Sequence, residues 1–136
     1  MAGTVTASGR HRAVLDTSVL LASGLAPLPG DLAISTASLA ELHFGVLVAP
    51  DQQVRADRLR RLGLIESQFQ ALPVDAAVAR EYGKLAAAVA SAGRQPAARV
   101  MDLLIAATAV AHRASLYTRN SADLRGLEHL LPIITV

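Results

Sequence analysis

The chain has 136 residues, 52% of them hydrophobic and 3% aromatic, which predicts a single domain with a largely aliphatic core. Because it contains no cysteine, disulfide frameworks and zinc or iron–sulfur sites with cysteine ligands are excluded. The formal net charge is only +2, yet all but one of the 13 basic residues are arginine, which suits a phosphate-bearing substrate but can equally reflect genome composition.

The N-terminal segment differs in composition from the rest of the chain. Residues 1–12 are small, polar and basic, so we expect a flexible extension before a domain that spans residues 13–136. The most apolar run, residues 103–111, is far shorter than the roughly 20 residues that cross a bilayer. We therefore expect a soluble cytoplasmic protein with no membrane partner.

An aspartate interrupts the apolar stretch of residues 13–21. Residues 13–15 predict a buried strand, and Asp16, Thr17 and Ser18 are suited to cap a helix that begins near Thr17. Asp16 would then lie at the carboxyl end of a strand, where open α/β sheets bind ligands. It is either a helix cap or the first candidate ligand.

A loop over residues 24–30, a short strand over 32–34 and a second helix are predicted next. Ser35 or Thr36 would cap this helix. Its apolar positions at helical spacing are Leu39, Leu42, Val46 and Leu47. Glu41 lies on another face, one turn before Gly45, and a glycine inside a helix costs about 1 kcal/mol relative to alanine. Close approach of a backbone or a ligand would explain Gly45, as would a tolerated glycine near a surface glutamate.

The next helix runs from Asp51 to about Phe69. Its apolar positions are Val54, Leu59, Leu62 and Ile65, and its basic positions are Arg55, Arg58, Arg60 and Arg61. A solvated helix face explains these arginines better than contact with a nucleic acid or an acidic partner. A short strand over 71–74 follows, and Asp75 caps a further helix. Its single apolar face comprises Val78, Tyr82, Leu85 and Val89.

The helix predicted over residues 97–113 is almost entirely apolar, so it should be buried. Asp102 lies in its first turns. A carboxylate in apolar surroundings is costly unless it is paired or binds a metal. Pairing with Arg99 or with the helix N-terminus is the alternative to a metal.

The last elements are a strand over 115–118, a short helix after Arg119 that includes Asp123, and a strand over 132–136. Strands and helices thus alternate along the chain. This order predicts an α/β fold with a mainly parallel sheet of about four to five strands, flanked by helices on both faces.

Four acids, Asp16, Glu41, Asp102 and Asp123, fall in or beside these apolar elements. Their mutual repulsion would make a cluster unstable without cations and should raise the pKa of at least one carboxyl. Mg²⁺ prefers oxygen ligands, and a pair of such ions can activate water for phosphodiester cleavage. The acids therefore predict a hydrolase that uses divalent metal.

Four segments also match the motifs of a known family in order and spacing. They are Val14 to Leu21, Ser38 to Leu42 with Gly45, Asp102 to Ala109, and Tyr117 to Asn120 with Asp123. Together they resemble the PIN-domain ribonucleases of the VapC type, the toxins of type II toxin–antitoxin pairs. The resemblance covers residues 13–136 and implies a PIN-like fold.

The resemblance implies an endoribonuclease that depends on Mg²⁺ or Mn²⁺. Asp16 and Asp102 would be the principal metal ligands, while Glu41 and Asp123 would complete the catalytic pocket directly or through water. The supporting residues would be Thr17 or Ser18, which orient Asp16, and Thr118 and Asn120, which support the pocket by hydrogen bonds. The chain departs from the family at Leu124, where the family usually has Phe, and this makes the role of Asp123 the least certain.

Members of this family generally form homodimers, and larger toxin–antitoxin assemblies occur. Each is inhibited by a VapB-type antitoxin whose tail fills a groove beside the active site, here expected along Leu39, Leu42 and Phe44. The RNA substrate would meet phosphate-binding arginines that bracket the acids in sequence. The candidates are Arg99, Arg119 and Arg125, for each of which an ion pair with a nearby acid is the alternative.

A catalytically silent PIN-like module that binds RNA or a protein is the main alternative function. Retention of all four acids favours the enzyme. A receiver domain would need a lysine near the last strand, but the only lysine is Lys84, and the Gly-rich loop of a P-loop nucleotidase is absent from the sequence.

Overall fold

The structure is a computed structural model that describes residues 11–22 and 27–136. Its centre is a five-stranded sheet in the order β3-β2-β1-β4-β5, in which every neighbouring pair is parallel. The strands are β1 (Arg12–Leu15), β2 (Asp31–Ser35), β3 (Gln70–Leu72), β4 (Ser115–Thr118) and β5 (Ile133–Thr135). The predicted α/β class and the parallel sheet are confirmed.

The helices follow the strands in the predicted alternation. They are α1 (Thr17–Leu21), α2 (Thr36–Leu47), α3 (Gln52–Gln68), α4 (Ala76–Ser91) and α5 (Val100–Ala111), with the 3₁₀ helices η1 (Pro96–Arg99) and η2 (Ser121–Leu124). Side-chain oxygens cap the first four by accepting backbone N–H groups, and the capping residues are Asp16, Ser35, Asp51 and Asp75. These bonds satisfy donors that a helix start otherwise leaves unpaired, so the caps fix where each helix begins.

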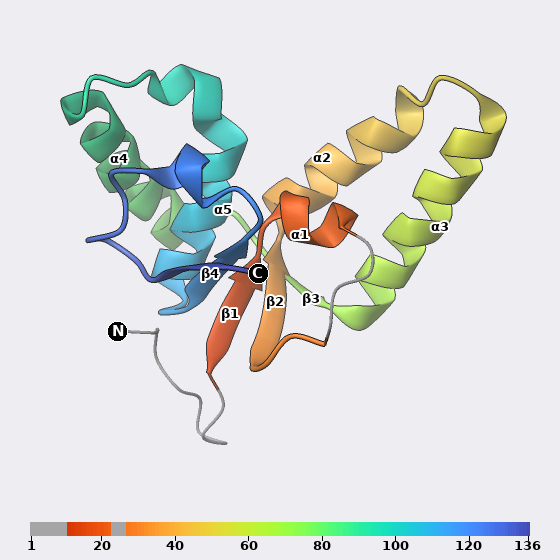
Figure 1. Cartoon of the computed structure of the whole chain (residues 1–136), viewed down its shortest axis with the longest axis horizontal. Helices are drawn as coiled ribbons and strands as arrows, with labels where there is room; N and C mark the ends of the chain where they lie inside the picture. The colour runs from red at the N-terminus through yellow and green to blue at the C-terminus, as the bar shows by residue number, and fades with distance from the viewer. Residues whose placement is uncertain (1–10, 23–26) are drawn as a thin grey trace.

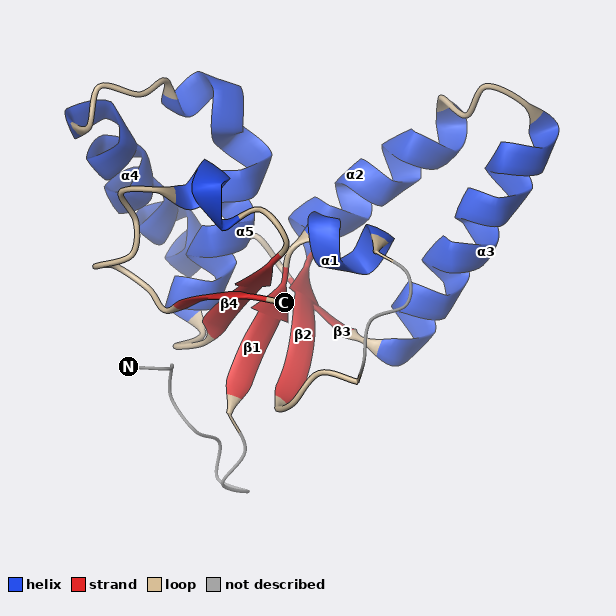
Figure 2. Cartoon of the chain, in the orientation of Figure 1, coloured by secondary structure: helices blue, strands red, loops and turns tan. Residues whose placement is uncertain are grey.

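Helices cover both faces of the sheet, as predicted (Figure 2). Because side chains alternate along a strand, β1 contributes Ala13 and Leu15 to one core and Val14 to the other. The first core packs against α1, α2 and α3, and the second against α4, α5 and η2. Each face thus buries its own apolar layer.

Several boundaries and faces differ from the prediction. The helix predicted over 97–113 is divided, because Pro96 opens the 3₁₀ turn η1 and α5 begins only at Val100. Leu47 and Leu59 have helical spacing but are 70% and 57% exposed, so they do not belong to the core. β1 begins one residue early, at Arg12.

Two expectations fall largely on residues that the structure does not describe. The predicted N-terminal extension lies mostly within residues 1–10, and residues 24–26 are the first part of the predicted loop; both ranges lie outside the described residues. Residues 27–30 are neither helix nor strand.

The strand order reverses beside β1, since β2 lies on one side of it and β4 on the other. Figure 1 shows that the carboxyl ends of these strands point toward α1, with α2 and α3 on one side and α4 and α5 on the other. Such a switch point is where α/β sheets bind ligands. Over residues 11–22 and 27–136, no helix has both the length and the apolar character needed to cross a membrane.

Candidate active site

The four predicted acids line one pocket of about 60 Å³ at the switch point of the sheet. We call the set Asp16, Glu41, Asp102 and Asp123 the acidic pocket. They come from four separate segments: the end of β1, the middle of α2, the first turn of α5 and η2. The remaining lining residues are Thr17, Ser18, Leu116, Asn120 and Leu124.

Asp16 caps α1, as one reading expected, and it also lines the pocket, while its role as a ligand stays a prediction. Its Oδ1 accepts the Val19 N–H at 3.2 Å and the hydroxyl proton of Ser18. Ser18 Oγ in turn accepts the N–H of Arg119 at 3.0 Å, which links α1 to the end of β4. These bonds fix the orientation of the Asp16 carboxylate.

Thr17 orients Glu41, so Ser18 is the residue of the expected pair that orients Asp16. The Thr17 hydroxyl donates to Glu41 Oε1 at 2.6 Å. Ser38 Oγ lies 3.1 Å from Thr17 Oγ1, and because Thr17 gives its only proton to Glu41, Ser38 is the donor in that pair. Ser38 is fully buried on the face of α2 that carries Glu41. The buried Ser38 hydroxyl thus fixes the orientation of the Thr17 hydroxyl, which in turn binds Glu41.

Asp102 has a raised pKa. The largest cause is that neighbouring protein atoms displace water from the carboxyl group, followed by the negative charges of Glu41, Asp16 and Asp123. The side chain nevertheless keeps solvent contact at the pocket, so the expected burial in apolar surroundings is wrong. The expectation that one carboxyl of the cluster has a raised pKa is confirmed.

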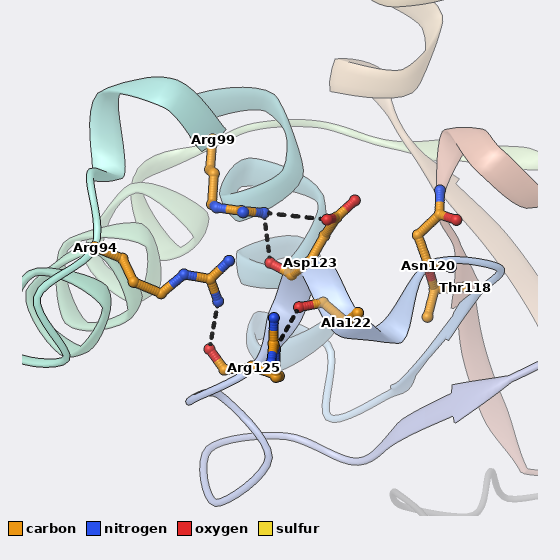
Figure 3. A network of polar contacts seen from close by, with 7 residues as sticks. All are labelled: Arg94, Arg99, Thr118, Asn120, Ala122, Asp123 and Arg125. Atoms are coloured by element: carbon orange, nitrogen blue, oxygen red, sulfur yellow. Dashed lines mark hydrogen bonds and ion pairs between the residues drawn. The ribbon is translucent and has the colours of Figure 1, made fainter.

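Arg99 pairs with Asp123, which argues against the alternative that it neutralises Asp102. Arg99 Nη1 donates to the Asp123 carbonyl oxygen at 2.6 Å and lies 3.8 Å from its carboxylate Oδ1 (Figure 3). The guanidinium lowers the pKa of Asp102 only as the smallest of the influences on it. The next residue, Leu124, is 4% exposed, so it fills the position that the family usually gives to Phe with an apolar side chain.

Two polar residues lie at the end of β4 and just beyond it, and the second of them, Asn120, lines the pocket. Thr118 is fully buried, and its Oγ1 accepts the backbone N–H of Asn120 at 3.0 Å. Asn120 lines the pocket, and Figure 3 shows its side chain on the other side of η2 from Arg99. Its support of the pocket by hydrogen bonds stays a prediction. Thr118 therefore fixes the backbone of Asn120 and does not contact its side chain in this bond.

A buried pair that the sequence analysis missed fastens α5 to the start of α2. Thr108 Oγ1 donates to Leu104 O at 2.8 Å, so Ser35 Oγ, 3.0 Å away, is the donor in the second contact. Both side chains are fully buried. The signal available in the sequence was a hydroxyl residue, Thr108, inside the most apolar helix. This hydrogen bond fixes the position of α5, which bears Asp102, relative to α2, which bears Glu41.

The donor set fits a hard divalent cation that keeps part of its hydration shell. Across the described residues, no group of three or more Asp, Glu, His or Cys side chains is placed to hold one metal ion. Mg²⁺ is commonly held by one or two carboxylates, with water completing its coordination. The acidic pocket offers such carboxylates together with room for solvent.

Two of the three candidate phosphate-binding arginines make contacts within the chain. Arg99 binds Asp123, and Arg125 Nε donates to Ala122 O at 3.2 Å (Figure 3). Arg119 is exposed, and among the described residues its guanidinium has no partner. Arg99 and Arg125 thus use part of their five N–H donors within the chain, whereas the guanidinium of Arg119 makes no contact among the described residues.

A larger groove of about 1110 Å³ opens beside the acidic pocket, between α1, α2 and α3. Thr17 and Glu41 line both cavities, so the two adjoin at these residues. The apolar lining residues of this helical groove include Leu42, Phe44, Leu64 and Ile65. Leu39 packs against the core instead, which corrects its expected place in the groove.

Comparisons with known proteins agree with this geometry. A family model described as PIN domain matches residues 13–127. A protein named Ribonuclease VapC5, from Mycobacterium tuberculosis, is 38% identical over 113 residues, which are 79% of this chain and 82% of that protein. Ribonuclease VapC8 from the same species is 37% identical over 100 residues, covering 71% of this chain and 88% of that protein.

A solved structure shares the whole fold. The crystal structure of VapBC-5 from Mycobacterium tuberculosis is described as a member of the VapBC family of toxin–antitoxin systems. It matches with a TM-score of 0.79 at 37% identity and covers 92% of this chain and 98% of that chain. The parallel sheet and its flanking helices are therefore those of this structural group.

Proposed function

Because the chain belongs to the PIN domain family and to the VapC ribonucleases within it, we propose that it is an endoribonuclease that cleaves RNA at the acidic pocket. The observation that most favours this function is the convergence of four carboxylates from four segments on one pocket. Lost hydration, and after it the negative charges of Glu41, Asp16 and Asp123, raise the pKa of Asp102, and carboxyl groups perturbed in this way are typical of catalytic and ion-binding sites.

We assign the metal to Asp16 and Asp102, with Glu41 and Asp123 completing the site directly or through water. When bound, Mg²⁺ or Mn²⁺ would supply an activated water molecule and would stabilise the leaving oxygen of the phosphodiester. The protein side chains around it hold the acids in position. Ser18 fixes Asp16, and Thr17 fixes Glu41.

Cleavage of total RNA in the presence of Mn²⁺, Mg²⁺ or excess chelator tests this function. Asp16→Asn and Asp102→Asn keep the side-chain volume but each removes a charged oxygen, so both should abolish cleavage. Glu66→Gln, which changes an exposed acid outside the pocket, should cut at the parent rate. Undiminished cleavage in chelator would contradict the metal assignment, and binding of RNA without cleavage would indicate the catalytically silent module.

We also propose that the helical groove binds the apolar segment of a VapB-type antitoxin. The relative of known structure belongs to a toxin–antitoxin system, and the groove joins an apolar wall to the acidic pocket. A segment lying in this groove would block access to Glu41, and a basic side chain could reach the acids. That the chain forms a homodimer remains a prediction, which a molar mass measured by light scattering would test.

Replacing the most exposed aromatic of the groove tests this partner assignment. Phe44 is 67% exposed, and Phe44→Ala should weaken neutralisation by a cognate antitoxin about tenfold or more without lowering RNA cleavage. Leu47→Ala changes an exposed residue of the same helix outside the groove, so it should be neutralised like the parent. Equal neutralisation of all three proteins would place the antitoxin elsewhere.

A further inference from the structure

Three arginines recur every third residue along α3, and each donates to backbone carbonyls near the end of another helix. The contacts are Arg55 Nη2 to Leu47 O (3.3 Å) and Arg58 Nη1 to Gly45 O (2.7 Å) in α2, and Arg61 Nη1 to Leu20 O (3.3 Å) and Leu21 O (2.7 Å) in α1. The expected solvated face holds for Arg55 and Arg58, which are exposed although each also binds a carbonyl, whereas Arg61 is half-buried. Helix ends leave carbonyls without intrahelical donors, and the arginines supply them.

Arg61 differs from the other two in its burial and in the helix that it contacts. It is half-buried, whereas Arg55 and Arg58 are exposed. Its partner helix α1 has only five residues, too few for a helix to be stable in isolation. The position of α1 therefore depends on contacts from outside it, and Arg61 binds two of its last carbonyls at once.

The opposite end of α1 carries the residues that orient the pocket. Asp16 caps the helix, and Thr17 and Ser18 form its first turn. Because a single short turn of helix joins these residues to Leu20 and Leu21, a shift at one end displaces the other. The bond between Asp16 and the N–H of Val19 transmits such a shift directly to the carboxylate.

We propose that Arg61 is a positioning residue of the active site, which fixes α1 against α3 and thereby sets the position of the Asp16 carboxylate. Val19 and Leu20 also pack in one apolar core with Leu62 and Ile65, so loss of the guanidinium should loosen α1 without unfolding the chain. Only the predicted effect of Arg61 on RNA cleavage rests on the proposed function; its effect on the position of α1 does not.

A direct contact between Arg61 and RNA or the antitoxin would be a different role, because Arg61 also lines the helical groove. Measurements on the protein without either ligand separate the two. Hydrogen exchange of the amides of residues 18–22 reports the stability of α1, and binding of Mn²⁺ alone, followed by electron paramagnetic resonance, reports the placement of Asp16.

The experiment compares the parent with Arg61→Ala, Arg61→Lys and Arg55→Ala. Arg55 is the matched control, since it is an α3 arginine that caps a helix end remote from Asp16. In Arg61→Ala we expect faster exchange in residues 18–22, a Mn²⁺ dissociation constant raised about 10- to 100-fold, and a lower kcat with little change in KM. Arg61→Lys, which keeps a cationic donor group but loses the planar fork of the guanidinium, should recover part of the affinity, and Arg55→Ala should match the parent.

Arg61→Ala with parental exchange and parental Mn²⁺ affinity would overturn the proposal. A raised KM for RNA in that variant, with kcat unchanged, would assign Arg61 to substrate binding instead. If Arg61→Ala does not fold, the comparison is made between Arg61→Lys and Arg55→Ala. Equal hydrogen exchange of residues 18–22 and equal Mn²⁺ affinity in these two variants would likewise contradict the proposal. If the parent does not cleave RNA, the proposed function fails, while exchange and Mn²⁺ binding still test Arg61.

Discussion

Asp102 lies where the charges of the other three pocket acids act on it together. Its pKa is raised from the ordinary value of 3.8 by lost hydration and by Glu41, Asp16 and Asp123. An acid with a raised folded-state pKa contributes stability below its unfolded pKa, and that contribution is lost as the pH rises through the folded-state value. Without metal, the folded protein should therefore become less stable between mild acid and neutral pH.

Asp102→Asn should raise the melting temperature of the metal-free protein near pH 7, on the order of a few degrees, because the amide removes the repelled charge. Thermal melts in chelator at pH 5 and pH 7 measure this, and the gain should be larger at pH 7. Mn²⁺ at 100 times its dissociation constant should stabilise the parent by about 2.7 kcal/mol and the variant much less.

Glu66→Gln is the control for these melts, because Glu66 is exposed and lies 3.8 Å from His43, outside the acidic pocket. It should melt close to the parent at both pH values. An Asp102→Asn protein that melts below its parent in chelator would show that Asp102 stabilises the fold through an attractive contact and that the acids do not repel one another in one pocket.

Individual site residues were predictable from the sequence to different degrees. The four acids stood out because they interrupt apolar segments or follow strands, and the structure brings all four to one pocket. The pairing of Thr17 with Glu41 was not predictable, since it depends on how α1 and α2 approach each other. Ser38 was visible in the matched motif, but only its burial beside Thr17 reveals its role.

At the scale of elements, the segment between β4 and η2 is the best candidate for contact with the RNA backbone. Arg119 is exposed in this segment and its backbone N–H binds Ser18 beside the pocket. Cationic side chains that contact phosphates release counterions, which makes the affinity fall as the salt concentration rises.

Arg119→Gln should weaken RNA binding and reduce the slope of log affinity against log salt concentration by about one. Binding titrations at several salt concentrations in chelator, which prevents cleavage, measure the slope. Arg80→Gln alters an exposed arginine of α4 and should keep the parental slope. An unchanged slope in Arg119→Gln would exclude a phosphate contact by this residue.

Helix starts were more predictable than helix faces. Asp16 and Asp75 cap the helices that they were expected to cap, and Asp51 caps the helix that it was expected to begin. Periodicity alone placed Leu47 and Leu59 inside, whereas both are exposed. Figure 1 shows that α2 and α3 extend beyond the sheet, so helical spacing on these helices does not imply contact with it. The arginines of α3 bind carbonyls of other helices, and such contacts leave no periodic trace in the sequence.

At the scale of the whole molecule, the alternation of strands and helices was enough to predict a parallel sheet covered on both faces. The strand order was not predictable, because it follows from which crossovers pass over which face. That order places the end of β1 beside the end of β4, and it thereby brings Asp16 close to Asn120 and Asp123. Residues more than 80 positions apart form one site for this reason.

The central claim is that these distant acids form one metal-binding pocket, and titration of the protein with Mn²⁺, followed by electron paramagnetic resonance, tests it most directly. The parent should bind Mn²⁺ with a saturable affinity that Glu66→Gln retains. Asp16→Asn and Asp102→Asn, which change separate segments, should each raise the dissociation constant at least about tenfold, since even residues outside the direct ligands of a metal often contribute that much. Parental Mn²⁺ affinity in both variants would contradict the account.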